Sequence, residues 1–312
     1  MRRFVGARTL GLAVLMALAL GGVLFLVVTR GGGDRSAIGV GVGPRGAAAA
    51  DGAAWIANAD SNTLSRIDEH AQKVTATIKV GKAPFGVTVG DGAVWVANAR
   101  SNTVSRFEAR TRTAGRTIAL GRYGRRPVAV ASGEGAIWVG SAKDDTVSRI
   151  DPLTSTVAAA IAVGSSPGGI AVGEGAVWVT NAKDDTVSRI DPSTNTVTAE
   201  IPVGAGPAAI AVGDGALWVA NAKHDTVARV DPTTDAVIGT IHVGDRPVAV
   251  AVGAGAVWVA NVKDNTVSRI DPGTNAVTDT IDVGANPAAI TVGDGAVWVA
   301  NQTDGSVSRL RP

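Results

Sequence analysis

Residues 258–272 read WVANVKDNTVSRIDP, and close copies of this stretch recur along most of the chain. The other copies begin at Trp55, Trp95, Trp138, Trp178, Trp218 and Trp298, so successive tryptophans lie 40 residues apart, with one spacing of 43. A fixed period of about 20–50 residues is typical of solenoids, propellers and repeat arrays. The chain is therefore a repeat protein, and its fold class follows from the content of one repeat.

Each repeat contains four short runs rich in valine, isoleucine and threonine, separated by turn residues. In the fourth repeat the runs cover residues 168–172, 176–181, 186–190 and 196–204, which predicts four β-strands, here called a, b, c and d. A four-stranded unit repeated radially is a β-propeller blade. We therefore predict an all-β fold, a seven-bladed β-propeller of four-stranded blades, over residues 36–312.

The two ends of the repeat region predict how the ring closes. The seventh repeat ends with SVSRLRP (306–312) after its strand c, whereas SAIGVG (36–41) aligns with the strand d sequence DTIDVG (279–284). We expect the N-terminal strand to complete the last blade, because an open ring would leave an unpaired strand edge.

The charge balance argues against a nucleic-acid partner. The chain has 29 lysines and arginines against 27 acidic residues. Residues 1–35 hold five of the arginines and one aspartate, which leaves 24 basic against 26 acidic residues in the predicted propeller. A nucleic-acid-binding domain needs a basic face, so we expect no nucleic acid to bind. The absence of cysteine excludes disulfides and thiolate metal sites.

The N-terminal region predicts a membrane anchor. Residues 9–28 carry no charge, and this length is about what a helix needs to cross a bilayer. Arginines precede it, so we expect residues 1–8 to be cytoplasmic, 9–29 to be a single-pass transmembrane signal anchor and 30–35 to be a tether. The propeller is then extracytoplasmic at the cell membrane. Cleavage after Ala17-Leu18-Ala19 is the alternative, and it would yield a secreted protein.

Most of the repeated polar residues are typical of turns. The c–d connections, such as DPSTN (191–195), place Asp151, Asp191, Asp231 and Asp271 where an aspartate accepts backbone N–H groups. The GDG and GEG a–b connections are typical of tight hairpins. The b–c connections centre on pairs such as Asp264-Asn265, which tolerate a positive φ. We therefore interpret these acids as turn residues rather than catalytic groups.

A ring of arginines occupies strand c in all seven repeats. If Asp184 and Asp185 centre the b–c hairpin, Arg189 lies opposite Thr180, on the same face as Trp178 and diagonal to it. This placement predicts cation–π packing between blades, worth on the order of 1 kcal/mol for each pair. A role of the arginine ring in ligand binding is the alternative.

A single functional site on a seven-fold ring must come from departures from the repeat. The largest departure is the three-residue insertion in GRYGRRP (121–127). We predict that Arg122, Tyr123, Arg125 and Arg126 bind a ligand there, because an arginine-rich loop suits a carboxylate, a phosphate or an acidic polymer. The d–a loops and b–c turns share one rim of the ring. The strand d that begins at residue 36 starts at the opposite rim, which carries the a–b and c–d turns. The insertion therefore lies on the membrane-distal rim, and a solvated surface loop is the alternative reading.

Two further patterns in the sequence could indicate a site, namely the three histidines and a glycine-rich segment. His70, His224 and His242 are far apart in the repeat register, so we expect no histidine metal cluster. Only His224 lies on the membrane-distal rim, which makes it a weak candidate for a catalytic base. GVGPRG (41–46) matches G-x-G-x-x-G, but no helix pattern follows it, so we expect no nucleotide site.

The repeats resemble two known families. NTVSRIDPGTNAVTDTIDVGANP (265–287) resembles the repeats of YVTN-type β-propellers, and GDGAVWV (90–96) resembles repeats of virginiamycin B lyase, another seven-bladed propeller. The second resemblance implies a lyase that opens a cyclic depsipeptide by elimination, with a divalent metal and a histidine base. The lyase repeats tend to read Trp-Phe-Thr-Glu where this chain reads Trp-Val-Ala-Asn (95–98), so no catalytic residue carries over.

Two functions follow as hypotheses. The first is a membrane-anchored binding module for a protein, a peptide or an anionic envelope ligand on the membrane-distal rim, with no cofactor. Near-identical repeats favour it because they leave few residues for chemistry. The second is a lyase similar to virginiamycin B lyase, which would need Mg²⁺.

Overall fold

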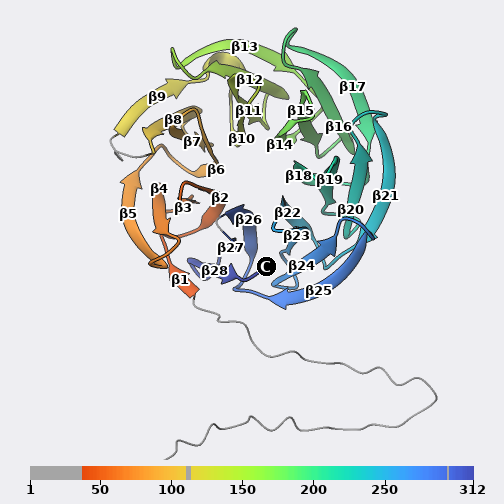
Figure 1. Ribbon diagram of the computed structural model, residues 1–312. Helices are drawn as coiled ribbons and strands as arrows, with labels where there is room; N and C mark the ends of the chain where they lie inside the picture. The colour runs from red at the N-terminus through yellow and green to blue at the C-terminus, as the bar shows by residue number, and fades with distance from the viewer. Residues whose placement is uncertain (1–36, 110–113, 294) are drawn as a thin grey trace, which may run out of the picture. The chain divides into compact units, whose positions relative to one another are not determined.

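The propeller is a ring of seven antiparallel sheets. The computed structural model describes residues 37–109, 114–293 and 295–312. The 28 strands of the described residues form seven four-stranded sheets arranged around a central axis (Figure 1). The predicted all-β, seven-bladed architecture is therefore confirmed.

Each blade runs outward from the axis in the order a, b, c, d (Figure 1). The innermost a strands are β2 (Pro44–Ala50), β6 (Pro84–Gly90), β10 (Pro127–Gly133), β14 (Pro167–Gly173), β18 (Pro207–Gly213), β22 (Pro247–Gly253) and β26 (Pro287–Gly293). The b strands are β3 (Ala53–Asn58), β7 (Ala93–Asn98), β11 (Ala136–Ser141), β15 (Ala176–Asn181), β19 (Ala216–Asn221), β23 (Ala256–Asn261) and β27 (Ala296–Asn301). The c strands are β4 (Thr63–Asp68), β8 (Thr103–Glu108), β12 (Thr146–Asp151), β16 (Thr186–Asp191), β20 (Thr226–Asp231), β24 (Thr266–Asp271) and β28 (Ser306–Leu310). The outermost d strands are β5 (Lys73–Lys79), β9 (Ala114–Ala119), β13 (Thr156–Ala162), β17 (Thr196–Pro202), β21 (Ala236–His242), β25 (Ala276–Asp282) and β1 (Ala37–Gly39).

The N-terminal strand closes the ring as expected. β1 pairs with β28 in the seventh blade, with Ala37 opposite Ser308 and Ile38 opposite Val307. The Val40 N–H donates to the Gly305 carbonyl at 2.9 Å, which continues the pairing into the next loop. Because β1 is an outermost strand that runs antiparallel to β28, its first residue lies at the face that carries the a–b and c–d turns.

The expected membrane segment, residues 9–29, lies outside the described residues, as do the n-region 1–8 and the tether 30–35. No helix in the described ranges is long and apolar enough to cross a membrane. The anchor therefore stays a prediction.

The hairpins follow the turn chemistry of their residues, but one predicted register is wrong. In the six a–b hairpins whose turn residues are both described, both have positive φ, for example 52° at Asp91 and 73° at Gly92, which is the geometry of a type I′ turn. The b–c turn contains four residues rather than two, because pairing begins at Asn181 and Thr186. Arg189 therefore lies directly opposite Trp178 instead of opposite Thr180. The shift is two residues, so both side chains still share one face.

The tryptophans form the core between neighbouring blades. All seven are at most 2% exposed. Trp178 packs in a cluster with Ile210, Leu217 and Val219 of the fifth blade, and its indole N–H donates to the Gly173 carbonyl at 3.0 Å. Each tryptophan thus fills the space between its own blade and the next one.

The arginine ring joins the blades by a different contact from the expected one. The Arg189 guanidinium lies 5.3 Å from the ring centroid of Trp178, so the cation–π pair forms within one blade rather than between blades. Its Nη1 atom then reaches Asp235 Oδ2 at 3.2 Å, in the c–d turn of the next blade. Arg229 makes the equivalent bond to Asn275 Oδ1 at 2.9 Å. Arg149, Arg189 and Arg229 therefore link their blade to the next by a hydrogen bond or ion pair at the c–d turn, whereas Arg66, Arg106 and Arg269 bond residues of their own blade.

Candidate ligand-binding cleft

One face of the ring, here called the loop face, is built from the d–a loops and the b–c turns. Within one blade these segments are joined by backbone bonds, such as Ala99 N–H to the Ala83 carbonyl at 2.8 Å. Between blades, the residue with positive φ in the b–c turn of the first six blades accepts an N–H from the following d–a loop, as Asn62 Oδ1 does from Ala83 at 2.8 Å. Both kinds of bond fix the loop face as a rigid surface.

A buried asparagine ends strand b in every blade except the third, and the d–a loop passes close to its side chain. Asn181 donates to Thr186 Oγ1 at 3.0 Å and to Ser188 Oγ at 2.8 Å. A Cβ atom at Gly164 would lie 2.6 Å from the Asn181 side chain, which explains the recurring Val-Gly before each junction. The third blade has Ser141 in place of the asparagine, and its d–a loop is the one with the insertion. The repeat is thus broken in the turn and in the loop of the same blade.

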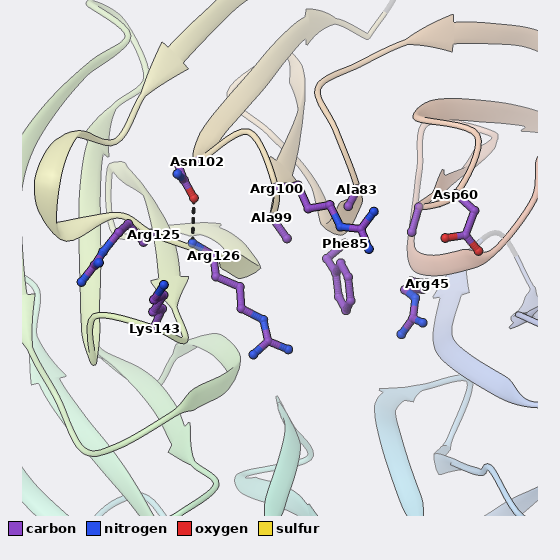
Figure 2. Close-up of a pocket in the computed structure, with 11 residues that line it drawn as sticks. Arg45, Asp60, Ala83, Phe85, Ala99, Arg100, Asn102, Arg125, Arg126 and Lys143 are labelled. Carbon is purple, nitrogen blue, oxygen red and sulfur yellow. Dashed lines mark hydrogen bonds between the residues drawn. The ribbon is translucent and has the colours of Figure 1, made fainter.

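The loop face is hollowed over the first three blades. This cleft has a volume of about 520 Å³. We call it the basic cleft, and its lining residues are Arg45, Ala59, Asp60, Ala83, Phe85, Ala99, Arg100, Asn102, Arg125, Arg126 and Lys143. In Figure 2 the side chains of Arg45, Phe85 and Arg126 extend toward the same open space, and Arg100 points toward Phe85.

Phe85 and Arg45 form the inner wall of the basic cleft. The Arg45 guanidinium lies 4.9 Å from the centroid of the Phe85 ring. Both residues directly follow the proline that begins strand a, where the other five repeats have valine, glycine or alanine. These two positions depart from the repeat, and this departure was the signal in the sequence that could have identified them.

The insertion forms the outer wall and is held by an ion pair. Residues Gly121–Tyr123 form the short 3₁₀ helix η1. Arg125 Nε donates to Asp144 Oδ1 at 2.6 Å, and the Arg125 backbone N–H donates to Asp144 Oδ2 at 2.6 Å. The side-chain bond from Arg125 lowers the pKa of Asp144, and the same bond raises the pKa of Arg125. Arg125 therefore neutralises Asp144 and anchors the loop.

The four predicted ligand-binding residues separate into two pairs. Arg125 and Arg126 line the basic cleft. Arg122 and Tyr123 are not among its lining residues; the Arg122 guanidinium stacks 4.5 Å from the ring centroid of Tyr123, which is 48% exposed. Sequence reasoning missed Arg45, Phe85, Arg100 and Lys143, which the fold brings to Arg126 from other loops.

Charge is distributed unevenly over the loop face. Its loops, turns and first strand residues carry seven basic and three acidic residues in the first three blades: Arg45, Lys82, Arg100, Arg122, Arg125, Arg126 and Lys143 against Asp60, Asp144 and Asp145. The last four blades carry four basic and six acidic residues: Lys183, Lys223, Arg246 and Lys263 against Asp184, Asp185, Asp225, Asp245, Asp264 and Asp304. The positive charge of this face is therefore concentrated around the basic cleft.

A second cavity of about 650 Å³ lies along the axis and shares Arg45 and Phe85 with the basic cleft. Most of its other side chains are small and apolar and belong to the a strands, such as Val128 and Ala208, but Arg246, Asn286 and Gln302 also line it. The basic cleft therefore opens toward a central channel.

The three histidines are not brought together. His224 Nδ1 accepts the Ala205 N–H at 3.2 Å, in the position where Asp184 accepts from Ser165 at 2.5 Å. His70 lies in a c–d turn and His242 ends β21. His224 thus replaces a turn aspartate and performs the same structural task.

The turn acids are engaged as the sequence predicts. The pKa of Asp191 is lowered by hydrogen bonds from the Ser193 hydroxyl and backbone N–H, and backbone N–H groups likewise lower the pKa of Asp151 and Asp231. Among the described residues, no three histidine or acidic side chains are placed to hold a metal ion.

A closed ring of seven four-stranded blades with a cleft at one end of its axis defines a seven-bladed β-propeller. The chain belongs to the virginiamycin B lyase family, whose model matches residues 72–312. Of the two resemblances in the sequence, the one to this family is thus confirmed, while the YVTN-type resemblance is not tested.

Three solved structures illustrate how similar the chain is to known lyases. The selenomethionine-substituted virginiamycin B lyase from Staphylococcus aureus is 20% identical with a TM-score of 0.79, over 89% of this chain and 99% of that one. A streptogramin B lyase structure is 21% identical with a TM-score of 0.79, and the match covers 88% of this chain and 96% of that one. A catalytically inactive histidine-to-alanine variant of the S. aureus enzyme with quinupristin is 21% identical with a TM-score of 0.79, and the match covers 89% of this chain and 99% of that one. At these identities the structures support the fold alone, and no curated protein matches the chain.

Proposed function

We propose that this protein is a binding module, held at the outer side of a cell membrane by residues 9–29, that takes its ligand on the loop face. The ligand is a protein, a peptide or an anionic component of the cell envelope. The observation that carries the proposal is the basic cleft, because it forms where the seven-fold repeat is broken in sequence, in loop length and in charge.

The position of β1 supports this arrangement. The chain enters the propeller at the face of the a–b and c–d turns, because β1 runs from that face toward Gly305 in the last b–c turn. A membrane segment attached before β1 would leave the loop face directed away from the membrane. If residues 9–29 are cleaved, the same face binds from a secreted protein.

A lyase activity is the second candidate, and membership of the virginiamycin B lyase family is the observation that favours it. General base catalysis needs a histidine or carboxylate free to reach the substrate. On the loop face Nδ1 of His224 is occupied by the Ala205 N–H, and Asp144 by Arg125. Asp60 is the carboxylate that lines the basic cleft, where it lies among arginine and lysine residues rather than beside a histidine. We therefore favour binding over elimination, and ring opening of a type B streptogramin is the test of the lyase alternative.

The binding face can be tested by blocking each side of the ring in turn. The chain has no cysteine, so a single introduced cysteine reacts specifically with a polyethylene glycol maleimide. Lys82→Cys places the polymer beside the basic cleft, where Lys82 is exposed and bonds Ser101 and Arg100 through its backbone N–H and carbonyl. Leu153→Cys places it on the opposite face, in a c–d turn, where Leu153 is 92% exposed.

The full-length protein in mild detergent is mixed with envelopes isolated from the cells that produce it, and co-sedimentation is measured. We expect the labelled Lys82→Cys protein to lose binding, while the unlabelled variant and the labelled Leu153→Cys protein retain it. Equal binding by all forms, or no binding by the unmodified protein, would exclude the proposed module.

A further inference from the structure

We propose that the basic cleft binds a ligand that presents at least two phosphate or carboxylate groups, held by Arg45, Arg100, Arg126 and Lys143. This inference rests on the proposed binding function and names the chemistry of its ligand. It follows from three properties of the cleft: its charge, its rigidity and its connection to the central channel.

The four cations are not neutralised by the protein. The ion pairs of the described residues include Arg125 with Asp144 and Lys263 with Asp245, but none involves Arg45, Arg100, Arg126 or Lys143. Asp60 is the one acidic residue that lines the cleft. Positive groups that share one cleft repel each other, and an anion that enters relieves this repulsion.

The backbone positions of three of these cations are fixed before any ligand arrives. Arg126 has a φ of 56°, its N–H donates to Asn102 Oδ1 at 3.0 Å, and its carbonyl accepts the Ala142 N–H at 3.1 Å (Figure 2). The Arg100 N–H donates to the Lys82 carbonyl at 3.1 Å. The Lys143 N–H donates to the Arg125 carbonyl at 3.4 Å. A preorganised site of this kind loses less conformational entropy on binding.

The arrangement favours a ligand with several anionic groups over a single small anion. The cations come from three successive blades around a cleft of about 520 Å³, so a ligand with several anionic groups can contact more of them than a single phosphate can. Guanidinium groups bind phosphate and carboxylate in a bidentate manner, so each arginine suits a separate anionic group. The Phe85 ring and the small apolar side chains of the channel beyond it can receive an uncharged part of the ligand.

The test compares two variants of the full-length protein that lose the same charge from the loop face. Arg100→Gln with Arg126→Gln removes two cations that line the basic cleft. Lys183→Gln with Lys223→Gln removes the cations at the register position of Arg100 in the fourth and fifth blades, and neither lysine lines the basic cleft or the central channel. Unfolding curves confirm that both variants are folded.

Binding is measured by calorimetry with inorganic tripolyphosphate, tricarballylate and inorganic phosphate. We expect one of the two multivalent anions to bind with a stoichiometry of one, and more tightly than phosphate. The double variant at the cleft should weaken this binding about tenfold or more, because two charge-assisted contacts are lost. The control variant should change it less than about twofold, since charges elsewhere on the face are screened.

The better multivalent anion identifies the ligand group as phosphate or carboxylate, and either result supports the inference. No binding of either anion, or equal weakening in both variants, overturns it. If the anion experiment fails, loss of envelope binding by the labelled Lys82→Cys protein would still support the binding module. The two experiments therefore distinguish failure of the ligand inference from failure of the proposed function.

Discussion

Truncation of one side chain in the N-terminal strand tests whether this strand closes the ring. Ile38 is 8% exposed and belongs to a cluster with Ala54, Ile56 and Val307. Ile38→Ala removes three carbon atoms, each worth about 0.8 kcal/mol of transfer free energy, and leaves a cavity. Because β1 has only three residues and Ile38 keeps some exposure, we expect the free energy of unfolding to fall by about 2–3 kcal/mol.

Ile241→Ala is the matched control for this substitution. Ile241 occupies the same position in strand d of the fifth blade and is 6% exposed. Unfolding of both variants in urea is followed by fluorescence, because the seven buried tryptophans report loss of the core. We expect similar shifts of the urea midpoint in the two variants. A midpoint unchanged by Ile38→Ala but lowered by Ile241→Ala would refute closure by β1.

Three further predictions concern the repeated polar residues. Arg189→Lys should lower the free energy of unfolding by about 1 kcal/mol, because lysine keeps the charge but loses the planar group that stacks on Trp178; an unchanged urea midpoint would contradict this. His224→Asp should raise the free energy of unfolding by about 0.5 kcal/mol, because a carboxylate accepts the Ala205 N–H more strongly than imidazole does. A lower free energy of unfolding in this variant would contradict the structural role of His224 in the turn. Asp191 and the other turn acids have lowered pKa values in the folded protein. Their contribution to stability is therefore complete above the unfolded pKa of about 3.9 and is lost as the pH falls through the lower folded pKa. In urea titrations at several pH values, Asp191→Asn should reduce the loss of stability at acid pH. An equal loss of stability in the variant and the unmodified protein would contradict the contribution of Asp191.

The fold was predictable because every blade repeats the same local chemistry. The period, the four strands, the Asp-Pro turns and the pairing of residues 36–41 with the last blade all follow from the sequence. The b–c register did not, because a hairpin centred on Asp184-Asp185 and a four-residue turn are both compatible with the same residues. The structure has the four-residue turn, because Asn181 pairs with Thr186. This register places Arg189 directly opposite Trp178.

The candidate site was only partly predictable. The insertion indicated Arg125 and Arg126, but it also indicated Arg122 and Tyr123, which stack on each other outside the cleft lining. Arg45 is about 80 residues from Arg126 in the sequence, and only the ring geometry brings it to the same cleft. Departures from a repeat therefore identify candidate residues, whereas the contacts between blades decide which of them act together.

The most direct test of binding against catalysis uses the full-length protein, a type B streptogramin and Mg²⁺. Elimination opens the depsipeptide ring without a change of mass, so the linear product is recognised by its chromatographic retention and its fragmentation pattern. We predict that the ring stays closed even at a protein concentration close to that of the streptogramin. A linear product that disappears in the His224→Ala variant would contradict the binding-module proposal and assign a lyase activity to this propeller.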